Sequence, residues 1–460
     1  MTSGSLGRRL ECVRPPRARG EVGSVEKPGR WLRDHERNGQ YNIIIGLIGL
    51  VVAVVFGFLW LHSFGAGSSS EVAVPPGART APPAAQAIVE GWSRIPAQAG
   101  VFGNANVEQI TDVSAGDGTF IAVGAHDSKP AIWRATVPQR WSRLTRVDQT
   151  PSSRPALIWS VAYDSGLWVA VGHDSNHAAV WTSSDADTWS LAPRDDPTYG
   201  TASQYSAMYS VVRFHGRWYA SGDFVAGGTT PQVAAVWMSS DGIHWTRSTL
   251  GTERARQVVD RPAMVHLYAT AHALVGVGSN ASLSTSSPTQ KCLAWASTDG
   301  VHWTAGSGPG GGFGDGSKAC SFSSVAYGHG VWLAVGNNGT AGAAWKSADG
   351  VHWTESTDGV TSLFDANGKT GVNDVVPTLT GWIAVGYSPG SGLTGDASVW
   401  DSKDASRWLQ VRQRPDVFGG ADRQIMACLL LTSSGAIAAG TDASAGDTSA
   451  AVWVKQGVAP

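Results

Sequence analysis

The spacing of glycine and aliphatic residues is the feature that most constrains how this chain can fold. Seven times a short apolar segment ends in a glycine, and a valine or leucine lies eleven residues before each of these glycines. A unit of roughly 50 residues made of short strands that recurs in this way is typical of a β-propeller blade. The sequence therefore predicts an all-β, seven-bladed β-propeller. The glycines are Gly124, Gly172, Gly222, Gly278, Gly336, Gly386 and Gly440.

Tryptophan pairs place the outer strands of each unit and indicate how the ring closes. Six units contain two tryptophans eight residues apart, as in Trp133 and Trp141, whereas the seventh unit ends at Trp453 without a second one. Trp92, at the front of the domain, begins the same Trp-Ser-Arg segment as Trp141. We therefore expect residues near Trp92 to form the last strand of the seventh blade, because this pairing removes exposed sheet edges.

Composition narrows the class of protein and of partner. Among 460 residues there are 57 glycines and 21 tryptophans, and only 15% are charged, which is typical of a turn-rich globular chain with an aromatic core. The net charge of −2 argues against a nucleic-acid partner, which requires a basic face. Because no nucleotide-binding, zinc-binding or nucleophile-elbow motif occurs, we expect neither a cofactor nor a metal.

A membrane anchor is predicted ahead of the propeller, at residues 42–64. Ile43 to Leu61 is a run of 19 residues without a charge, long enough to span a bilayer as a helix. Nine Lys and Arg residues lie in the leader and Arg79 alone follows the run, so the N-terminus should be cytoplasmic and the propeller extracytoplasmic. A cleaved signal peptide is the competing interpretation. The remaining regions are a disordered basic leader (1–41), a Pro/Ala/Ser-rich tether (65–87) and the propeller (88–460).

Cysteine positions agree with an exported domain. Cys292 opens the third strand of blade four and Cys320 the first strand of blade five, so a disulfide between them is possible in an oxidising compartment. The sequence leaves open whether they are bonded. Cys428 is expected on an inner strand, as a small buried side chain.

The two faces of the predicted disc differ in their connections. On one face the turns are tight and contain the Asp, Asn and Gly residues that accept positive φ. On the other face, the interval from the blade glycine to the next tryptophan is 9 residues in three blades and 13 to 17 in the other four. Loops that vary on a repeated scaffold favour binding there.

The turns between third and fourth strands resemble a known repeat. Segments 240–245, 298–303 and 348–353 each follow a serine and place Asp-Gly, an aliphatic residue and His-Trp in the same order. They resemble the Asp box, and the chain over about 370 residues resembles the sialidase-like Asp-box propellers. The resemblance implies structural turns in which a carboxylate accepts backbone N–H bonds. The corresponding aspartates are Asp185, Asp241, Asp299, Asp349 and Asp404.

The resemblance also raises the question of catalysis. Sialidases carry an Arg-Ile-Pro whose arginine belongs to a trio that holds the substrate carboxylate, and this chain has Arg94-Ile95-Pro96. The same slot of the repeat holds Arg143 and Arg247, which favours an ordinary outer-strand residue. Glutamates are scarce in the propeller, and none, Glu108 included, is expected on an inner strand. We therefore expect no catalytic residues and no enzyme, with sialidase-like glycoside hydrolysis as an alternative.

Polar residues of the variable-loop face are the candidate ligand-binding set. Imidazole, carboxylate and amide groups there can bind a ligand, although they also suit solvated Asx turns. We interpret the chain as a non-enzymatic protein-binding scaffold for another envelope protein, with carbohydrate binding at the same face as the alternative. The candidate residues are His126, Asp127, His173, Asp174, His177, Asp223, Asn337, Asn338 and Asp442.

Overall fold

The computed structural model describes residues 91–457, apart from short internal gaps. The gaps are 98–99, 104–106, 150–154, 194–196, 201–203, 226–231, 251–259, 283–289, 309–312, 314–318, 340, 357–369, 390–394, 412–413, 421–422 and 444–447. The predicted leader, transmembrane segment and tether therefore lie outside the described residues. Within the part that is described, no helix has the length and apolar character needed to cross a membrane.

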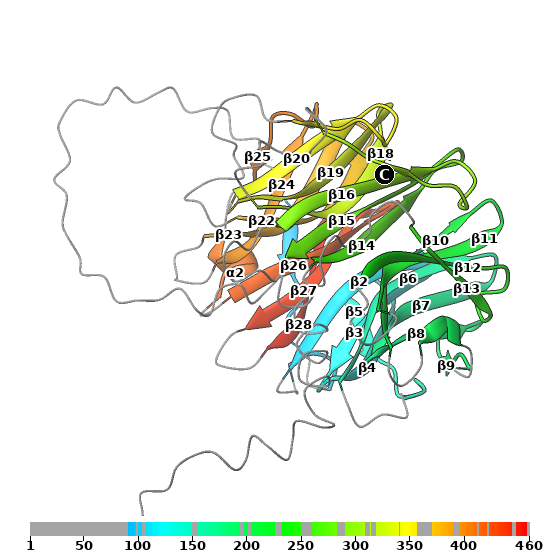
Figure 1. Cartoon of the computed structure of the whole chain (residues 1–460). Coiled ribbons are helices and arrows are strands. Elements are labelled where there is room, and N and C mark those ends of the chain that lie inside the picture. The colour runs from blue at the N-terminus through cyan, green and yellow to red at the C-terminus, as the bar shows by residue number, and fades with distance from the viewer. Residues whose placement is uncertain are drawn as a thin grey trace, which may run out of the picture. The chain divides into compact units, whose positions relative to one another are not determined.

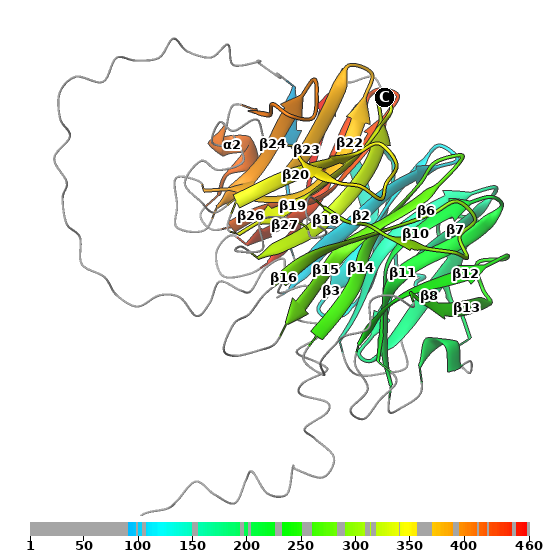
Figure 2. The same ribbon diagram turned by 45° about the horizontal axis from the view of Figure 1, so that its top comes forward.

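Seven four-stranded antiparallel sheets make up the described chain, and Figures 1 and 2 show them following one another in sequence order. Blade 1 contains β2 (Glu108–Gly116), β3 (Thr119–His126), β4 (Lys129–Val137) and β5 (Arg140–Arg143). Blade 2 contains β6 (Ala156–Asp164), β7 (Leu167–Asp174), β8 (His177–Ser183) and β9 (Ser190–Leu191). Blade 3 contains β10 (Tyr205–Phe214), β11 (Arg217–Val225), β12 (Val233–Ser239) and β13 (Trp245–Thr249). Blade 4 contains β14 (Asp260–Ala269), β15 (Leu274–Ser282), β16 (Gln290–Ser297) and β17 (Thr304–Ala305).

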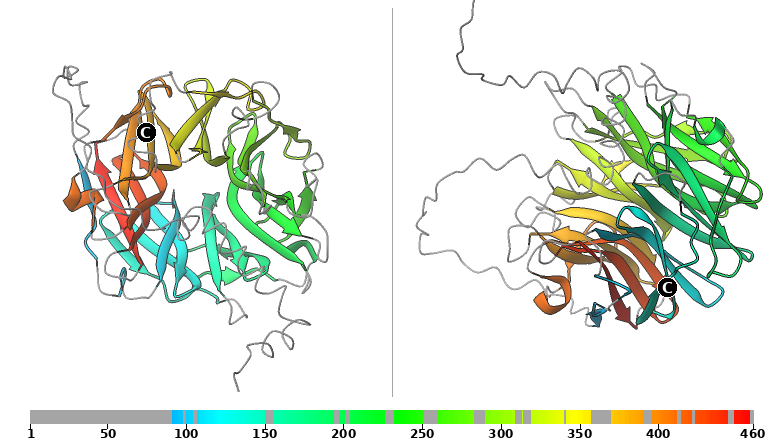
Figure 3. Two further views of the ribbon diagram at one scale, coloured as in Figure 1. Left: turned by 60° about the vertical axis from the view of Figure 1, so that its left-hand side comes forward. Right: turned by 90° about the horizontal axis from the view of Figure 1, so that it is seen from below.

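The remaining blades follow the same order. Blade 5 contains β18 (Cys320–Gly328), β19 (Val331–Asn338), β20 (Ala341–Ser347) and β21 (Thr354–Glu355). Blade 6 contains β22 (Gly371–Thr378), β23 (Gly381–Ser388), β24 (Asp396–Ser402) and β25 (Leu409–Gln410). Blade 7 contains β26 (Arg423–Thr432), β27 (Gly435–Ala443), β28 (Ser449–Gln456) and, from the front of the domain, β1 (Trp92–Arg94). Two short helical turns, η1 (Pro197–Tyr199) and α2 (Pro415–Phe418), lie in connections. Figure 3 shows the sheets arranged as a ring, with the first strand of each blade innermost.

Ring closure by the N-terminal strand is confirmed. Strand β1 pairs antiparallel with β28, and Arg94 lies opposite Trp453 in this pairing. Trp92 and Ile95 are buried, and the Ile95 N–H donates to the Val452 carbonyl. The predicted seven-bladed propeller is therefore correct in blade number and in the way its two ends meet.

The seven glycines have a steric cause. A Cβ added to Gly124 would lie 2.0 Å from the carbonyl oxygen of Gln109, and the other six glycines meet a carbonyl of the facing strand at 1.8–2.0 Å. A β-bulge in the first strand follows each of these carbonyls, so the backbone there comes unusually close. We call the extra residues the bulge residues. They are Thr111, Trp159, Tyr209, Val265, Ser323, Asn373 and Ala427.

Tryptophans of the third strands form the core between blades. Trp133, Trp181 and Trp237 are completely buried, and their equivalents in the other blades are at most 1% exposed. The second tryptophan of each pair is not opposite the first, because Trp133 faces Arg143 and Trp141 faces Ala135. The offset lets the rings of one blade pack at different depths against the next sheet.

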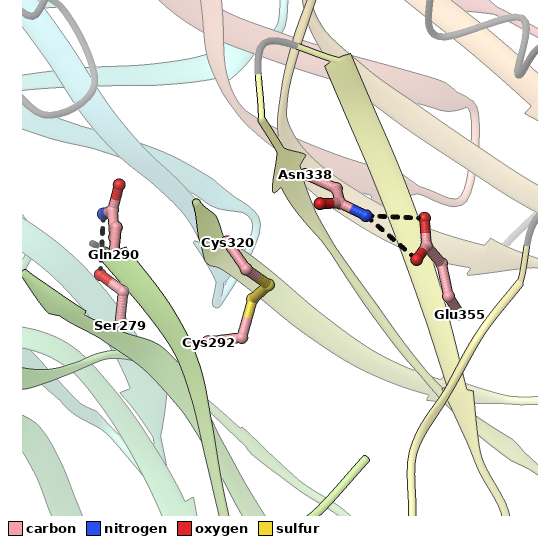
Figure 4. The surroundings of a disulfide bond; sticks show 6 residues. All are labelled: Ser279, Gln290, Cys292, Cys320, Asn338 and Glu355. Atoms are coloured by element: carbon pink, nitrogen blue, oxygen red, sulfur yellow. Dashed lines mark hydrogen bonds between the residues drawn. A yellow bond between two sulfur atoms is a disulfide. The ribbon is translucent and has the colours of Figure 1, made fainter. Parts of the chain in front are cut away.

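A disulfide joins two neighbouring blades. Cys292 on β16 and Cys320 on β18 are bonded, with their Cα atoms 5.0 Å apart, so the pairing left open by the sequence is formed. Figure 4 shows the bond between two hydrogen-bonded pairs, Gln290 with Ser279 and Asn338 with Glu355. The bridge closes a loop of 28 residues between blades 4 and 5.

Candidate functional site

The Asp-box turns are built as structural elements. The Asp241 carboxylate accepts the N–H groups of Ile243 at 2.9 Å and His244 at 2.8 Å, and the same pair of backbone bonds recurs at Asp185, Asp299, Asp349 and Asp404. At Asp185 these backbone donors lower the pKa of the carboxyl to about 2. Each box is thus an Asx-type turn in which one carboxylate oxygen, Oδ1, accepts both backbone N–H groups.

A second set of side chains forms hydrogen bonds between the innermost strands of neighbouring blades. We call these the clasp residues: Asp112, Ser160, Ser210, His266, Ser324, Asp374 and Cys428, each of which directly follows a bulge residue. Ser160 accepts the N–H of Val211 in the next blade, and Ser210 and His266 do the same one blade further on. The clasp therefore links the first strands around the ring.

Two clasp residues are aspartates, and the carboxylate of each accepts one N–H from its own blade and one from the next blade. Asp112 accepts the N–H groups of Val113 and Val161, and Asp374 accepts those of Val375 and Leu429. Burial raises the pKa of Asp112 to about 6 and that of Asp374 to about 7. Burial also lowers the pKa of the His266 imidazole to about 4. The N–H group that follows each clasp residue is therefore bonded to a side chain in all seven blades.

The predicted ligand-binding residues do not form one site. Asn337 donates to the Thr370 carbonyl, and Asn338 donates to Glu355. Asp174 is 3% exposed and His177 is half-buried. Their ligand-binding role stays a prediction, because the structure shows only what they contact within the chain.

His173 and Asp223 do meet, in a cluster that we call the axial site: Trp159, His173, Tyr209, Asp223 and Gln232. The Trp159 indole N–H donates to His173 Nδ1 at 2.9 Å, and their rings stack with centroids 6.1 Å apart. The Tyr209 and Trp159 rings are nearly perpendicular, with centroids 5.7 Å apart, and the Tyr209 hydroxyl donates to Asp223 Oδ1 at 3.1 Å. Gln232 donates to the other oxygen of Asp223.

Exposure differs within the axial site. Trp159 is half-buried, whereas His173, Tyr209, Asp223 and Gln232 are buried. Trp159 and Tyr209 are bulge residues of adjacent blades, and the other five bulge residues carry no aromatic ring. The site is therefore a local aromatic feature of blades 2 and 3 rather than a repeat of the ring.

The protonation of this cluster follows from its geometry. Because an indole N–H only donates, His173 Nδ1 must accept, and the neutral ring then carries its proton on Nε2. Burial lowers the pKa of His173 to about 4, so this neutral form persists at neutral pH. Burial and the Asp223 carboxylate raise the pKa of Tyr209 well above its ordinary value. The cluster therefore offers neutral donors and one carboxylate, and Tyr209 is a donor rather than a nucleophile.

A second pair on the loop face contains a residue that the sequence misplaced. Glu108 was expected away from the inner strands, but it begins the innermost strand β2, opposite His126, and is 1% exposed. The prediction was wrong because β2 extends two residues beyond the apolar segment that begins at Ile110. Glu108 Oε1 lies 2.9 Å from His126 Nδ1, and Oε2 accepts the Gly103 and Ala450 N–H groups. His126 Nε2 lies 3.9 Å from the exposed Asp127.

Arg94 of the Arg-Ile-Pro segment is engaged elsewhere. Its guanidinium pairs with Asp442, which also accepts from Gln424, and it lies 5.6 Å from the Trp453 ring centroid. Strand β1 is the outermost strand of its sheet, and the Arg94 guanidinium extends inward to Asp442 on β27. This agrees with an outer-strand residue, and Asp442 holds the seam between β1 and blade 7.

Sequence reasoning missed Trp159, Tyr209, Gln232 and the Glu108–His126 pair. A signal was present, because an aromatic residue directly precedes the clasp residue in only two of seven units. Within the described chain, no group of three or more His, Cys, Asp or Glu side chains is placed to hold a metal ion.

Comparisons with known proteins find likeness in structure only. No protein-family model matches the chain, and no curated protein matches it. Trypanosoma rangeli sialidase in complex with sialic acid is 11% identical, with a TM-score of 0.44, over 80% of this chain and 58% of the sialidase chain. This chain therefore spans less than two thirds of that enzyme. The GH93 alpha-L-arabinofuranosidase of Fusarium graminearum is 13% identical, with a TM-score of 0.39, over 79% and 97%.

These comparisons correct two predictions. An N-acetylgalactosamine deacetylase from F. plautii is also similar, at 13% identity and a TM-score of 0.28 over 53% of this chain and 83% of the deacetylase. The similar folds are thus enzymes named for sugar substrates, and they contradict the predictions of a non-enzymatic protein scaffold and of no enzyme without assigning an activity to this chain. At these identities the likeness concerns the fold alone, and the sialidase-like β-propeller fold expected from the Asp boxes is confirmed.

Proposed function

We propose that this chain is a membrane-anchored, extracytoplasmic propeller that binds a carbohydrate at the axial site. The observation that carries the proposal is the half-buried Trp159 ring, fixed against buried hydrogen-bonding side chains. A sugar ring has an apolar face of C–H groups and an edge of hydroxyls. An indole face with nearby buried donors and acceptors complements both.

The polar groups beside Trp159 suit hydroxyl recognition. His173 Nε2 carries a proton in the neutral ring and can donate to a hydroxyl. Asp223 has a carboxylate that already accepts from Tyr209 and Gln232, so its orientation is set before any ligand arrives. Fixing these side chains in advance lowers the entropy that binding would otherwise cost. The Ile43 to Leu61 run and the basic leader support an anchor with the propeller outside the cytoplasm.

Glycan binding to the purified full-length chain tests the proposal. Trp159→Ala should weaken binding at least about tenfold, because it removes the stacking surface. Trp159→Phe should retain most of the affinity, since a ring remains, and His173→Ala should lose part of it. Tyr327→Ala is the matched control, because Tyr327 is a half-exposed aromatic near the tight turn at Gly328. If no glycan binds, or if Trp159→Ala binds as the wild type does, the proposal fails.

Glycoside hydrolysis is the second candidate, and the Glu108–His126 pair is the observation that favours it. A buried carboxylate that accepts the Nδ1 proton leaves Nε2 as a base at the loop face. Turnover of fluorogenic glycosides tests this, and His126→Gln should abolish turnover while glycan binding persists. Turnover that survives in His126→Gln would show that the Glu108–His126 pair has no role in hydrolysis.

A further inference from the structure

The outer hairpin of blade 1, formed by β4 and β5, departs from the Asp-box pattern. Pro138 and Gln139 connect its two strands. Val137 lies four residues before Trp141, the same interval that separates each box aspartate of blades 2 to 6 from the tryptophan that follows it. Val137 is also 45% exposed. Blade 1 therefore exposes an apolar side chain at the position where five other blades place a carboxylate.

This outer hairpin is also strongly basic. Residues 129–143 contain no Asp or Glu, and their basic residues are Lys129, Arg134, Arg140 and Arg143. Arg140 is exposed and lies opposite Val137 in the pairing of the two strands, and Arg143 is half-buried. The inner turn of blade 1 carries one exposed carboxylate, that of Asp117. The hairpin thus combines an exposed apolar residue with several positive charges.

The chain enters the propeller next to this hairpin. The tight turns, which connect third to fourth strands, lie on one face of the ring that we call the tight-turn face. Strand β1 is the fourth strand of blade 7, so its first residue, Trp92, lies toward the same face as Pro138. Ile95 and Trp133 share one core cluster, and Figure 3 shows blade 1 in cyan beside blade 7 in red.

We propose that the outer hairpin of blade 1 docks on the anionic surface of the membrane that anchors the chain. The inference rests on the anchor in the proposed function, because residues 62–91 would then hold the tight-turn face near the bilayer. Guanidinium groups pair well with lipid phosphates, and an apolar side chain gains from burial among the headgroups. The box aspartates of the other blades would be repelled by an anionic surface, so the contact is confined to blade 1.

A fluorophore on the hairpin of the full-length chain in vesicles tests this docking. The fluorophore is one whose emission shifts to the blue in apolar surroundings, and it is attached at Gln139→Cys in a Cys12→Ser background, because Cys428 is buried. Vesicles of phosphatidylcholine are compared with vesicles that also contain the anionic lipid phosphatidylglycerol. The blue shift should occur on the anionic vesicles only. The same label at Thr298→Cys, an exposed position in the box turn of blade 4, should show no shift.

Charge variants show whether the arginines cause the docking. Arg140→Gln combined with Arg143→Gln should lower the ratio of docked to undocked propeller at least about tenfold, because each arginine near an anionic surface contributes about fivefold. High salt should also lower the ratio, since screening weakens the attraction. Val137→Asp, which introduces the carboxylate of the other boxes, should lower it as well. Arg217→Gln is the matched control, because Arg217 is an exposed arginine at the inner turn of blade 3, and it should leave the ratio unchanged.

The outcomes separate this inference from the proposed anchor. Equal shifts at Gln139→Cys on neutral and anionic vesicles would overturn the inference, and so would an equal shift at Thr298→Cys. An equal loss of docking in Arg217→Gln and in the double variant would also overturn it. Release of the chain from both kinds of vesicle by alkaline carbonate would instead disprove the anchor. Docking of added protein on anionic vesicles through the same arginines would then still support the hairpin as the contact.

Discussion

The Asp-box turns and the axial site lie toward opposite ends of the blades and follow opposite rules. In the boxes, five aspartates make the same two backbone bonds, so each turn is a copy of the others. At the axial site, Trp159 and Tyr209 occupy positions that five other blades fill without an aromatic residue. Repetition marks the groups that hold the propeller together, and departure from the repeat is the feature on which the proposed carbohydrate site rests.

Preventing ring closure should destabilise the Asp-box turns and the axial site together. This is the largest effect on stability that we expect. Removing residues 91–96 deletes β1 and leaves the edge of β28 unpaired. Trp92 and Ile95 each contribute about 1.5–3 kcal/mol of burial, a large share of the 5–15 kcal/mol typical of a folded protein. We expect the free energy of unfolding to fall by about 3–6 kcal/mol in chemical denaturation. A chain starting at residue 88 is the control, and equal stability of the two would contradict the closure.

A change in a box turn should damage stability without touching the ligand. Gly300 has φ +74°, and a Cβ added there would lie 2.4 Å from the ring of the buried Tyr219. Gly300→Ala should cost about 2–4 kcal/mol, from the left-handed backbone and the clash together. Gly118→Ala is the matched control, because Gly118 has φ +69° but open space around it, so only about 1 kcal/mol is expected.

The glycan affinity of folded Gly300→Ala should equal that of the wild type, measured below its melting temperature. Trp159→Ala should show the reverse pattern, with stability kept and affinity lost. If both variants lost stability and affinity in parallel, the division between a structural face and a binding site would not hold.

The sequence was sufficient for the architecture because its repeated residues have local causes. Each blade glycine exists because a Cβ would meet a carbonyl at about 2 Å, and each third-strand tryptophan fills the space between sheets. Such causes recur in every blade, so they appear as a period in the chain. The closure at Trp92 followed from the one unit in which that period was incomplete.

The axial site could not be predicted in the same way. Strand periodicity assumes that side chains alternate, but a bulge adds one residue and breaks the alternation. Trp159 and Tyr209 are those added residues, so a pattern of period two does not show which way their side chains point. Glu108 was missed because β2 begins before its apolar pattern does. One partner of Asp442, Arg94, comes from β1 and is 348 residues away from it in sequence.

Removal of the Tyr209 hydroxyl should have a smaller effect on glycan affinity. Tyr209→Phe removes the bond to Asp223 while keeping the ring against Trp159. Loss of one hydrogen bond of about 1 kcal/mol should weaken glycan binding about three- to tenfold. Calorimetric titration measures the change, and Tyr327→Phe is the control. An affinity equal to that of the wild type would exclude Asp223 orientation as part of binding.

The smallest effect expected is a difference in pH dependence between the clasp and the boxes. The pKa of Asp374 is about 7 in the folded chain and near 3.9 when unfolded, so the folded state holds the proton more tightly. Its contribution to stability is present below about pH 4 and is lost as the pH rises toward 7. The pKa of Asp185 is about 2, so its contribution is complete above about pH 4 and is lost only in acid.

Asp374→Asn should therefore reduce the loss of stability between pH 5 and pH 8, measured by chemical denaturation, whereas Asp185→Asn should shift stability equally at both. His266 and His173, with pKa values of about 4, oppose this trend in acid because they remain neutral only in the folded state. Subtracting the stability of the wild type from that of each variant at the same pH cancels the contribution of these two histidines. An unchanged slope in Asp374→Asn would mean that the clasp carboxyl is ionised throughout, and that burial at the axis is weaker than the hydrogen bonds that hold it.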